Sequence, residues 1–168
     1  MLKDFFKLEE TEEEIIRVNH AGELGAKQIY LGQLKALNGD VEILEMLESE
    51  LEHLEYFEEK IKQTGVRPSM LNEIWKPSAF LMGYLSAKIG GRKIAMLCTE
   101  KVEEVIEKHY ENQISILENS ELKEKIIKFR AEEIEHMKIG KIEGRESELI
   151  GKLFSGLTKL AIVLSKKI

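Results

Sequence analysis

Apolar residues recur at three- and four-residue steps over most of the chain, a spacing typical of amphipathic α-helices rather than strands. Glycine, asparagine and proline interrupt this pattern at a few places, where we expect the helices to end. The pattern therefore predicts an all-α fold. We expect helices over residues 12–37, 41–63, 78–89, 93–118, 120–140 and 146–165.

The longest predicted connection covers residues 65–77, because Gly65, Pro68 and Pro77 all fall within it. A shorter break is expected at the Gly90-Gly91 pair. A chain of 168 residues is long enough to bury one hydrophobic core. We therefore expect residues 1–168 to form a single domain.

Composition narrows the range of functions. All but two of the 31 acidic residues are glutamates, which favour helices more than aspartates do. The net charge of −6 argues against nucleic-acid binding, which needs a basic face. A single cysteine excludes a disulfide scaffold and a zinc finger. The remaining candidates for chemistry are the glutamates and four histidines.

An internal repeat selects a few of these glutamates and histidines. A Glu-x-x-His pattern occurs twice, and its two side chains share one helix face. The helix before each pattern carries Glu-x6-Tyr-x2-Gln, and only a short insertion between the helices distinguishes the spacing of the two copies. One copy consists of Glu23, Tyr30, Gln33, Glu50 and His53, and the other of Glu103, Tyr110, Gln113, Glu133 and His136.

The repeated carboxylates and histidines suit a pair of metal ions. Isolated carboxylates on mostly apolar faces are costly unless they are neutralised. Four carboxylates with two neutral imidazoles balance two divalent cations, and oxygen-rich ligation suits iron or manganese. One Glu from each of two helices, with Glu-x-x-His from two others, is typical of dinuclear sites in ferritin-like four-helix bundles. We expect the metal ligands to be Glu23, Glu50, His53, Glu103, Glu133 and His136.

Several segments go beyond generic ferritin-like spacing. The sequence of residues 17–23, Arg-Val-Asn-His-Ala-Gly-Glu, resembles the start of the first helix in the demethoxyubiquinone hydroxylase family of ubiquinone biosynthesis. The segments 29–33, 98–104, 109–114 and 129–136 resemble the same family, and the resemblance covers roughly residues 13–168. It implies a single ferritin-like di-iron domain, built from two repeated helix pairs with two additional apolar helices.

The resemblance also implies an activity and places the site residues. The family's six metal ligands fall on the same six positions, with Glu103 favoured over its neighbour Glu104 by the repeat. Tyr110 and His109 match positions near the family's active site, whereas the repeat mate Tyr30 is expected to fill the core. For His20, contact with a ligand and contact at the helix start remain open.

The implied enzyme is an O2-dependent 3-demethoxyubiquinol 5-hydroxylase, a monooxygenase with two iron ions that acts on a membrane-embedded quinone. The sequence has no Gly-rich dinucleotide fingerprint, so the electrons must come from outside the protein. The resemblance implies NADH as their source. Two alternatives stay open at this point. A ferritin-like iron-storage or iron-detoxifying protein would share all six ligands, and a structural helical bundle would hold no metal.

Two long stretches contain no acidic residue. Residues 74–99 and 149–168 each carry four basic residues, and the last predicted helix has a continuous apolar face. An apolar helix face bordered by lysine favours the interface of an anionic membrane. No segment has the length and hydrophobicity of a membrane-spanning helix, and no signal or transit peptide is visible.

These features predict a peripheral membrane protein. The resemblance implies other ubiquinone-biosynthesis proteins as candidate partners, and the net charge argues against nucleic acid. The expected location is the cytoplasmic face of a bacterial inner membrane. For a mature eukaryotic chain, it would be the matrix side of the mitochondrial inner membrane.

Overall fold

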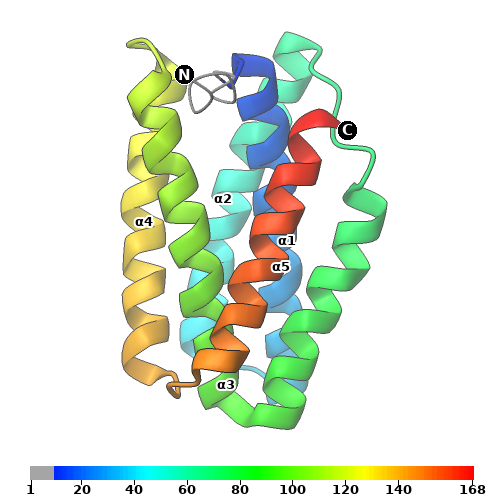
Figure 1. The fold of residues 1–168 in the computed structure, drawn as a ribbon, viewed down its shortest axis with the longest axis vertical. Helices are drawn as coiled ribbons and strands as arrows, with labels where there is room; N and C mark the ends of the chain where they lie inside the picture. Colours follow the sequence, from blue (N-terminus) through cyan, green and yellow to red (C-terminus); the bar gives the residue numbers. More distant parts are fainter. Residues whose placement is uncertain (1–9) are drawn as a thin grey trace, which may run out of the picture.

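The structure is a computed structural model that describes residues 10–168, and these residues contain five helices and no strand (Figure 1). The predicted all-α fold is confirmed. The helices are α1 (Glu12–Leu37), α2 (Val41–Thr64), α3 (Asn72–Ile116), α4 (Glu121–Glu143) and α5 (Glu148–Lys167).

Four helical segments form the bundle: α1, α2, the second half of α3, and α4. Helix α1 packs against α2 and α3, and α3 packs against α4. Helix α5 lies over α1 and α3, while the first half of α3 runs along one edge of the molecule (Figure 1). The two additional apolar helices predicted from the sequence are therefore α5 and the first half of α3.

Local sequence explains where the helices of the bundle begin and end. Thr11 and Glu14 form a capping box at the start of α1, and Asn38 ends this helix in the left-handed conformation. The Asp40 side chain then accepts a hydrogen bond from the Ile43 N–H and caps α2. Ser120 caps α4 in the same way. These caps fix the helix lengths, and thereby the heights at which side chains on neighbouring helices meet.

Helix α3 turns sharply at Gly91, where the sequence predicts a break. The φ and ψ angles of Gly91 are 67° and −172°, a conformation that residues with a side chain rarely adopt. The neighbouring Arg92 holds this corner. Its guanidinium lies 2.7 Å from Asp40 and 2.9 Å from Glu143, and it also pairs with Glu42. The corner of α3 is thus tied to the start of α2 and the end of α4.

The predicted start of the third helix at residue 78 is wrong. Helix α3 begins at Asn72 and contains Pro77, so the connection before it spans only residues 65–71. Proline lacks an N–H and removes one backbone hydrogen bond near this helix end. The Trp75 Nε1–H donates to Ser165 Oγ at 2.8 Å, which ties this turn to α5. Tertiary contact therefore continues the helix where local sequence favours a break. Helix α4 also extends past its predicted end at residue 140 to Glu143, and the bounds of α5 are slightly later than predicted.

The first half of α3 touches α1 backbone to backbone, at two glycines. A Cβ atom built on Gly83 would lie 2.0 Å from the Ile29 carbonyl oxygen. One built on Gly32 would lie 2.2 Å from the Phe80 carbonyl oxygen. Glycine at both positions lets the two helices approach this closely.

Candidate metal centre

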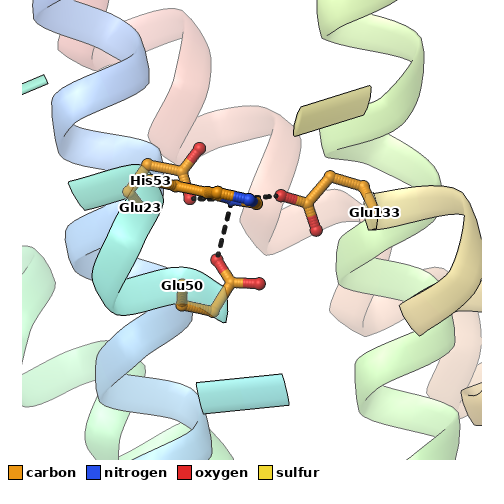
Figure 2. Close-up of side chains that lie close together, drawn as sticks. All are labelled: Glu23, Glu50, His53 and Glu133. Atoms are coloured by element: carbon orange, nitrogen blue, oxygen red, sulfur yellow. Dashed lines mark ion pairs between the residues drawn. The ribbon is translucent and has the colours of Figure 1, made fainter. Parts of the chain in front are cut away.

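All six predicted ligand side chains meet inside the bundle, and all six residues are buried. Glu23 comes from α1, Glu50 and His53 from α2, Glu103 from α3, and Glu133 and His136 from α4. Figure 2 shows four of them converging from three helices. The structure thus brings together residues from four helices that are far apart in the sequence.

The six side chains form two overlapping groups that share Glu50 and Glu133. Glu23 and His53 complete one group, and Glu103 and His136 complete the other. Within each group, one ligand atom per residue lies within 4.8 Å of the others. This arrangement has the composition of a site for two metal ions.

The Nδ1 atom of each histidine faces the carboxylates. In His53, it lies 3.0 Å from Glu133 and 3.5 Å from Glu23. In His136, it lies 3.1 Å from Glu50 and 3.2 Å from Glu133. Each histidine therefore contacts the Glu of the other Glu-x-x-His pattern, and the two repeats are interlocked.

Hydrogen bonds between α1 and α3 also connect each repeat with the other. The Tyr30 hydroxyl donates to Glu103 at 2.6 Å, and the Tyr110 hydroxyl donates to Glu23. Each repeat thus supplies the tyrosine that holds the glutamate of the other repeat. The expectation that Tyr30 only fills the core is incomplete, because its ring is buried but its hydroxyl orients a candidate ligand.

The repeated glutamines add a second pair of ties between α1 and α3. Gln113 and Asn19 exchange hydrogen bonds of 2.8 and 3.0 Å. Gln33 donates to the Ala95 carbonyl at 2.9 Å and lies 3.4 Å from the Thr99 hydroxyl. The side chains of Asn19, Gln33 and Gln113 thus connect α1 and α3 by hydrogen bonds.

Several buried ligand atoms within residues 10–168 make no hydrogen bond, and their polar neighbours at ion-pair distance are other candidate ligands. Burying a polar atom without a partner costs about 1–3 kcal/mol, and more for a charged group. The unpartnered atoms cluster at the centre of the site, where metal coordination would satisfy them. They are Glu23 Oε2, both Glu50 oxygens, His53 Nδ1, Glu103 Oε2 and Glu133 Oε1. The residues present therefore fit a pair of cations.

Electrostatics lead to the same conclusion. Burial and then the neighbouring carboxylate Glu133 raise the pKa values of Glu50 and Glu103 well above the ordinary range. Burial alone would lower the pKa of His53, but the carboxylates of Glu133 and Glu23 close to its Nδ1 atom raise it to about 12. Without cations, this cluster compensates its crowded negative charge by binding protons.

His109 lies apart from the six side chains. Gln113 Nε2 lies 2.7 Å from His109 Nε2, and Glu10 is 3.9 Å away. Burial, followed by the positive charge of Lys166, lowers the pKa of His109 to about 3. A neutral His109 therefore supports the Gln113 network beside the centre. Its predicted catalytic role stays a prediction.

Within the described residues, two that are close to ligand positions in the sequence, Glu104 and His20, make no hydrogen bond to the six side chains. Glu104 is partly exposed and pairs with Lys101, whereas Glu103 faces the centre. His20 is buried but makes no hydrogen bond to any of the six side chains, all of which lie in the described residues.

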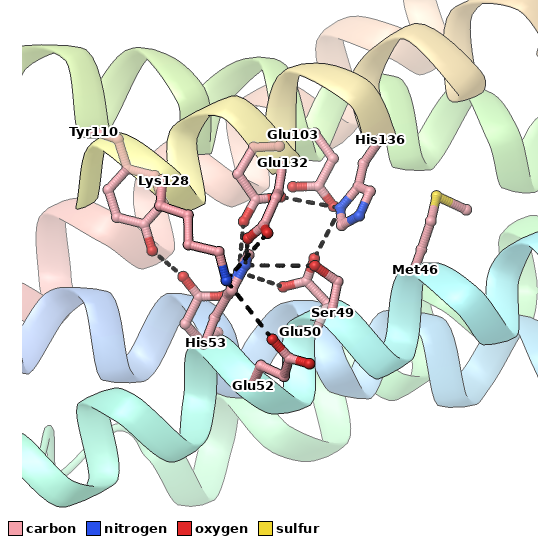
Figure 3. Close-up of polar contacts among 12 residues, drawn as sticks. Met46, Ser49, Glu50, Glu52, His53, Glu103, Tyr110, Lys128, Glu132 and His136 are labelled. Carbon is pink, nitrogen blue, oxygen red and sulfur yellow. Dashed lines mark hydrogen bonds and ion pairs between the residues drawn. The ribbon is translucent and has the colours of Figure 1, made fainter. Parts of the chain in front are cut away.

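Sequence reasoning missed one residue at the centre. The Glu132 carboxylate lies 2.7 Å from His53 Nε2, on the side of the ring that faces away from the other carboxylates (Figure 3). Its position immediately before Glu133 on α4 was the available signal, but the repeat has no matching glutamate, because Ser49 precedes Glu50.

An apolar cavity of about 150 Å³ lies between α1, both halves of α3, and α5. Ala26 and Val102, on its wall, are each within one turn of a candidate ligand, Glu23 or Glu103. Trp75 and Leu157 contribute to the wall from the two additional helices. These helices therefore enclose apolar space beside the polar centre.

A four-helix bundle with two shared carboxylates, two further glutamates and two histidines at its centre defines a ferritin-like protein of the dinuclear carboxylate class. The model of the family described as ubiquinone biosynthesis protein COQ7 matches residues 10–165. The chain belongs to this family. The resemblance drawn from the sequence motifs is thereby confirmed.

Curated relatives agree with this assignment. The chain is 44% identical over 168 residues to the mitochondrial NADPH-dependent 3-demethoxyubiquinone 3-hydroxylase of Dictyostelium discoideum, covering 93% of this chain and 77% of the relative. It is 38% identical over 173 residues to the Bos taurus protein of the same name, covering 95% and 79%. It is 37% identical over 163 residues to the 3-demethoxyubiquinol 3-hydroxylase of Rhodospirillum rubrum, covering 91% and 76%. The family and these names favour the hydroxylase over the iron-storage and metal-free alternatives.

Proposed function

We propose that this protein hydroxylates the ring of a demethoxyubiquinol-type substrate with O2, as a step in ubiquinone biosynthesis. The observation that carries the proposal is the buried centre of four glutamates and two histidines, several of whose atoms make no hydrogen bond among the described residues. The relatives' names, which place the hydroxylation at ring position 3, support the substrate class.

Two iron ions fit the centre best, because its ligands are mostly carboxylates. Glu50 and Glu133, which belong to both groups of side chains, would hold the ions together with Glu23, His53, Glu103 and His136. When bound, a reduced di-iron pair supplies the activation of O2 that ring hydroxylation requires.

The chain's own residues position the ligands and exclude water. Tyr30 and Tyr110 hold the carboxylates of Glu103 and Glu23, so both glutamates keep one orientation. Met46 and Phe129 are buried beside the centre and limit access of water. An ordered, dry site of this kind protects reactive intermediates from side reactions.

The apolar cavity between α1, α3 and α5 is the proposed place for the quinol ring. Its walls are almost entirely apolar, which suits a ring with an isoprenoid tail. The cavity lies between the candidate ligands and α5, so the tail would leave the protein along α5 and the first half of α3.

The outer surfaces of these two helices suit contact with a membrane. Leu149, Leu153, Leu160 and Val163 are exposed on α5, although Phe154 of the same helix is buried. Further exposed apolar side chains lie on the first half of α3, namely Ile74, Leu81, Leu85 and Ile89. No helix within residues 10–168 is long and apolar enough to cross a bilayer. Partial insertion into the interface would give the enzyme access to a lipid-dissolved quinone.

The electron donor in this proposal is a reduced nicotinamide. NADH is the expectation from the resemblance, whereas the Dictyostelium discoideum and Bos taurus relatives are named for NADPH. The proposed location is an inner membrane, on the bacterial cytoplasmic face or the mitochondrial matrix side. Two of the relatives are named as mitochondrial proteins, which supports a mitochondrial setting.

The central test combines metal analysis with turnover. Protein loaded with ferrous iron should hold two ions and should insert one oxygen atom from isotopically labelled O2 into a short-tailed demethoxyquinol. Glu103→Ala and Glu133→Ala should lose metal and activity. Glu104→Ala and Glu135→Ala are matched controls, because these side chains lie next to ligand positions but are substantially exposed.

Two results would contradict the proposal. Full metal content in both ligand variants would show that the site is wrongly assigned. A wild type that holds two irons but consumes no O2 with quinol present would favour storage over hydroxylation.

Membrane contact needs its own test. Leu153→Gln and Leu160→Gln change side chains that are 58% and 51% exposed, so folding should persist while partition into anionic liposomes falls. Leu44→Gln on α2 is the control, since this leucine is 47% exposed on a different helix of the bundle. Equal partition of all these proteins would defeat the membrane proposal.

A further inference from the structure

The two-fold pattern of the centre is broken at the residue that precedes the Glu of each Glu-x-x-His pattern. Ligands, tyrosines and glutamines all have a mate at the corresponding position of the other repeat. The residue before Glu133 is Glu132, but the residue before Glu50 is Ser49. One half of the centre therefore carries an additional carboxylate that the other half lacks.

This carboxylate acts on only one of the two histidines. Glu132 Oε2 lies 2.7 Å from His53 Nε2, and Ser49 Oγ lies 3.5 Å from the same atom (Figure 3). His136 also points its Nδ1 at the carboxylates, but its Nε2 has no hydrogen-bond partner among the described residues. Ser49 thus lies beside the histidine that already has a partner.

His53 is also more deeply buried and more closely packed than His136. The His53 side chain is completely buried and its ring lies 4.1 Å from that of Phe129, measured between centroids. His136 remains 8% exposed, and its ring is 6.4 Å from Tyr30 in an edge-on arrangement. Glu132 is held in turn by Lys128, 3.4 Å away on the outer face of α4.

We infer that Glu132 is a positioning residue that makes the two metal positions unequal. By accepting a hydrogen bond from the Nε2–H of His53, it fixes the tautomer whose Nδ1 lone pair points at the metal. The same hydrogen bond makes the Nδ1 atom of His53 more basic, and therefore a stronger metal ligand. The position at His53 therefore binds its ion more tightly, and the position at His136 is filled last and emptied first. This inference rests on the metal centre proposed above.

The test is stepwise metal binding, independent of turnover. Metal-free protein is titrated with Co²⁺ under anaerobic conditions and followed by calorimetry and the visible spectrum of the bound ion. Wild type should show two steps of different affinity. Glu132→Ala should weaken the tighter step by about 10- to 100-fold and leave the other unchanged. Glu132→Gln keeps an acceptor oxygen without the charge and should show a smaller loss.

Two backgrounds identify the histidine through which Glu132 acts. In the His136→Ala background, adding Glu132→Ala should still lower the affinity for the one remaining Co²⁺ ion. In His53→Ala, adding Glu132→Ala should have no further effect, because the side chain that it orients is gone. Lys128→Met removes the outer ion pair but keeps the carboxylate, and should bind both ions as wild type does.

Each contrary result has one meaning. If Glu132→Ala weakens both steps equally or neither, or still acts in His53→Ala, the inference is overturned while the metal centre stands. If wild type binds no Co²⁺ at all, the proposed centre fails and the inference with it. Circular dichroism of each variant shows whether the helices are retained, and the Gln variant serves if the Ala variant does not fold.

Discussion

The close approach of α1 and α3 leads to a sharp prediction about stability. A Cβ atom at Gly83 would lie 2.0 Å from the Ile29 carbonyl oxygen, 2.7 Å from its carbon and 2.8 Å from the Ile29 Cα. These are backbone atoms of a helix, so they cannot move aside as a side-chain end would. Gly83→Ala therefore requires the two helices to move apart until these distances reach ordinary van der Waals contact, which begins at 3.4 Å.

The magnitude follows from two opposing effects. Overpacking of this kind costs about 1–3 kcal/mol, and sometimes more. Replacing a glycine in a helix by alanine returns about 1 kcal/mol. Because the clash is with backbone, we place its cost at or above the upper end of that range. We therefore expect Gly83→Ala to lower the free energy of unfolding by about 2 kcal/mol, and Tm by about 4–8 °C for a chain of this size.

Gly156→Ala is the matched control. Gly156 lies in α5, is exposed, and would have no atom within 4 Å of its new Cβ. This change should leave stability equal or slightly higher. Urea and thermal unfolding of both variants measure the difference. A Gly83→Ala protein as stable as wild type would refute the close approach of α1 and α3.

Three further predictions concern the centre and its supports. In metal-free protein, the raised pKa values of Glu50 and Glu103 mean that the folded state binds more protons than the unfolded state. Stability should therefore fall as the pH rises above 4.5, the ordinary pKa of glutamate, and saturating Co²⁺ should remove the decline in thermal unfolding; a flat pH profile without metal would contradict this. Tyr30→Phe should weaken Co²⁺ binding at the Glu103 position and Tyr110→Phe at the Glu23 position, by about tenfold each in calorimetry; no loss in either would contradict their orienting role. Asp40→Ala should cost about 1–2 kcal/mol in urea unfolding, because it removes the cap of α2 and an ion pair of Arg92; an unchanged midpoint would show that neither contact matters.

The fold was largely predictable because its signals are local. The bounds of α1, its end at Asn38 and the cap at Asp40 follow from helix periodicity and capping preferences. The corner at Gly91 follows from the glycine pair. The continuation of α3 through Pro77 did not follow, because contact between Trp75 and α5 outweighs the local effect of proline.

The candidate site was predictable to the extent that it repeats. The matching order of residues in the two copies selected six side chains, which the structure brings together. The partner of each tyrosine was not predictable, because only three-dimensional packing shows that Tyr30 reaches Glu103 rather than Glu23. Glu132 was missed for the opposite reason: it is the position at which the repeat fails.

The crossed pairing of tyrosines and glutamates also has a consequence for how the protein is made. A ribosome that has synthesised α1 and α2 has released Glu23 without Tyr110, and Tyr30 without Glu103. In neither half of the chain does the glutamate, Glu23 or Glu103, lie together with the tyrosine hydroxyl that orients it. The centre is completed only when α3 and α4 have docked, so metal uptake would report that the four-helix bundle has assembled.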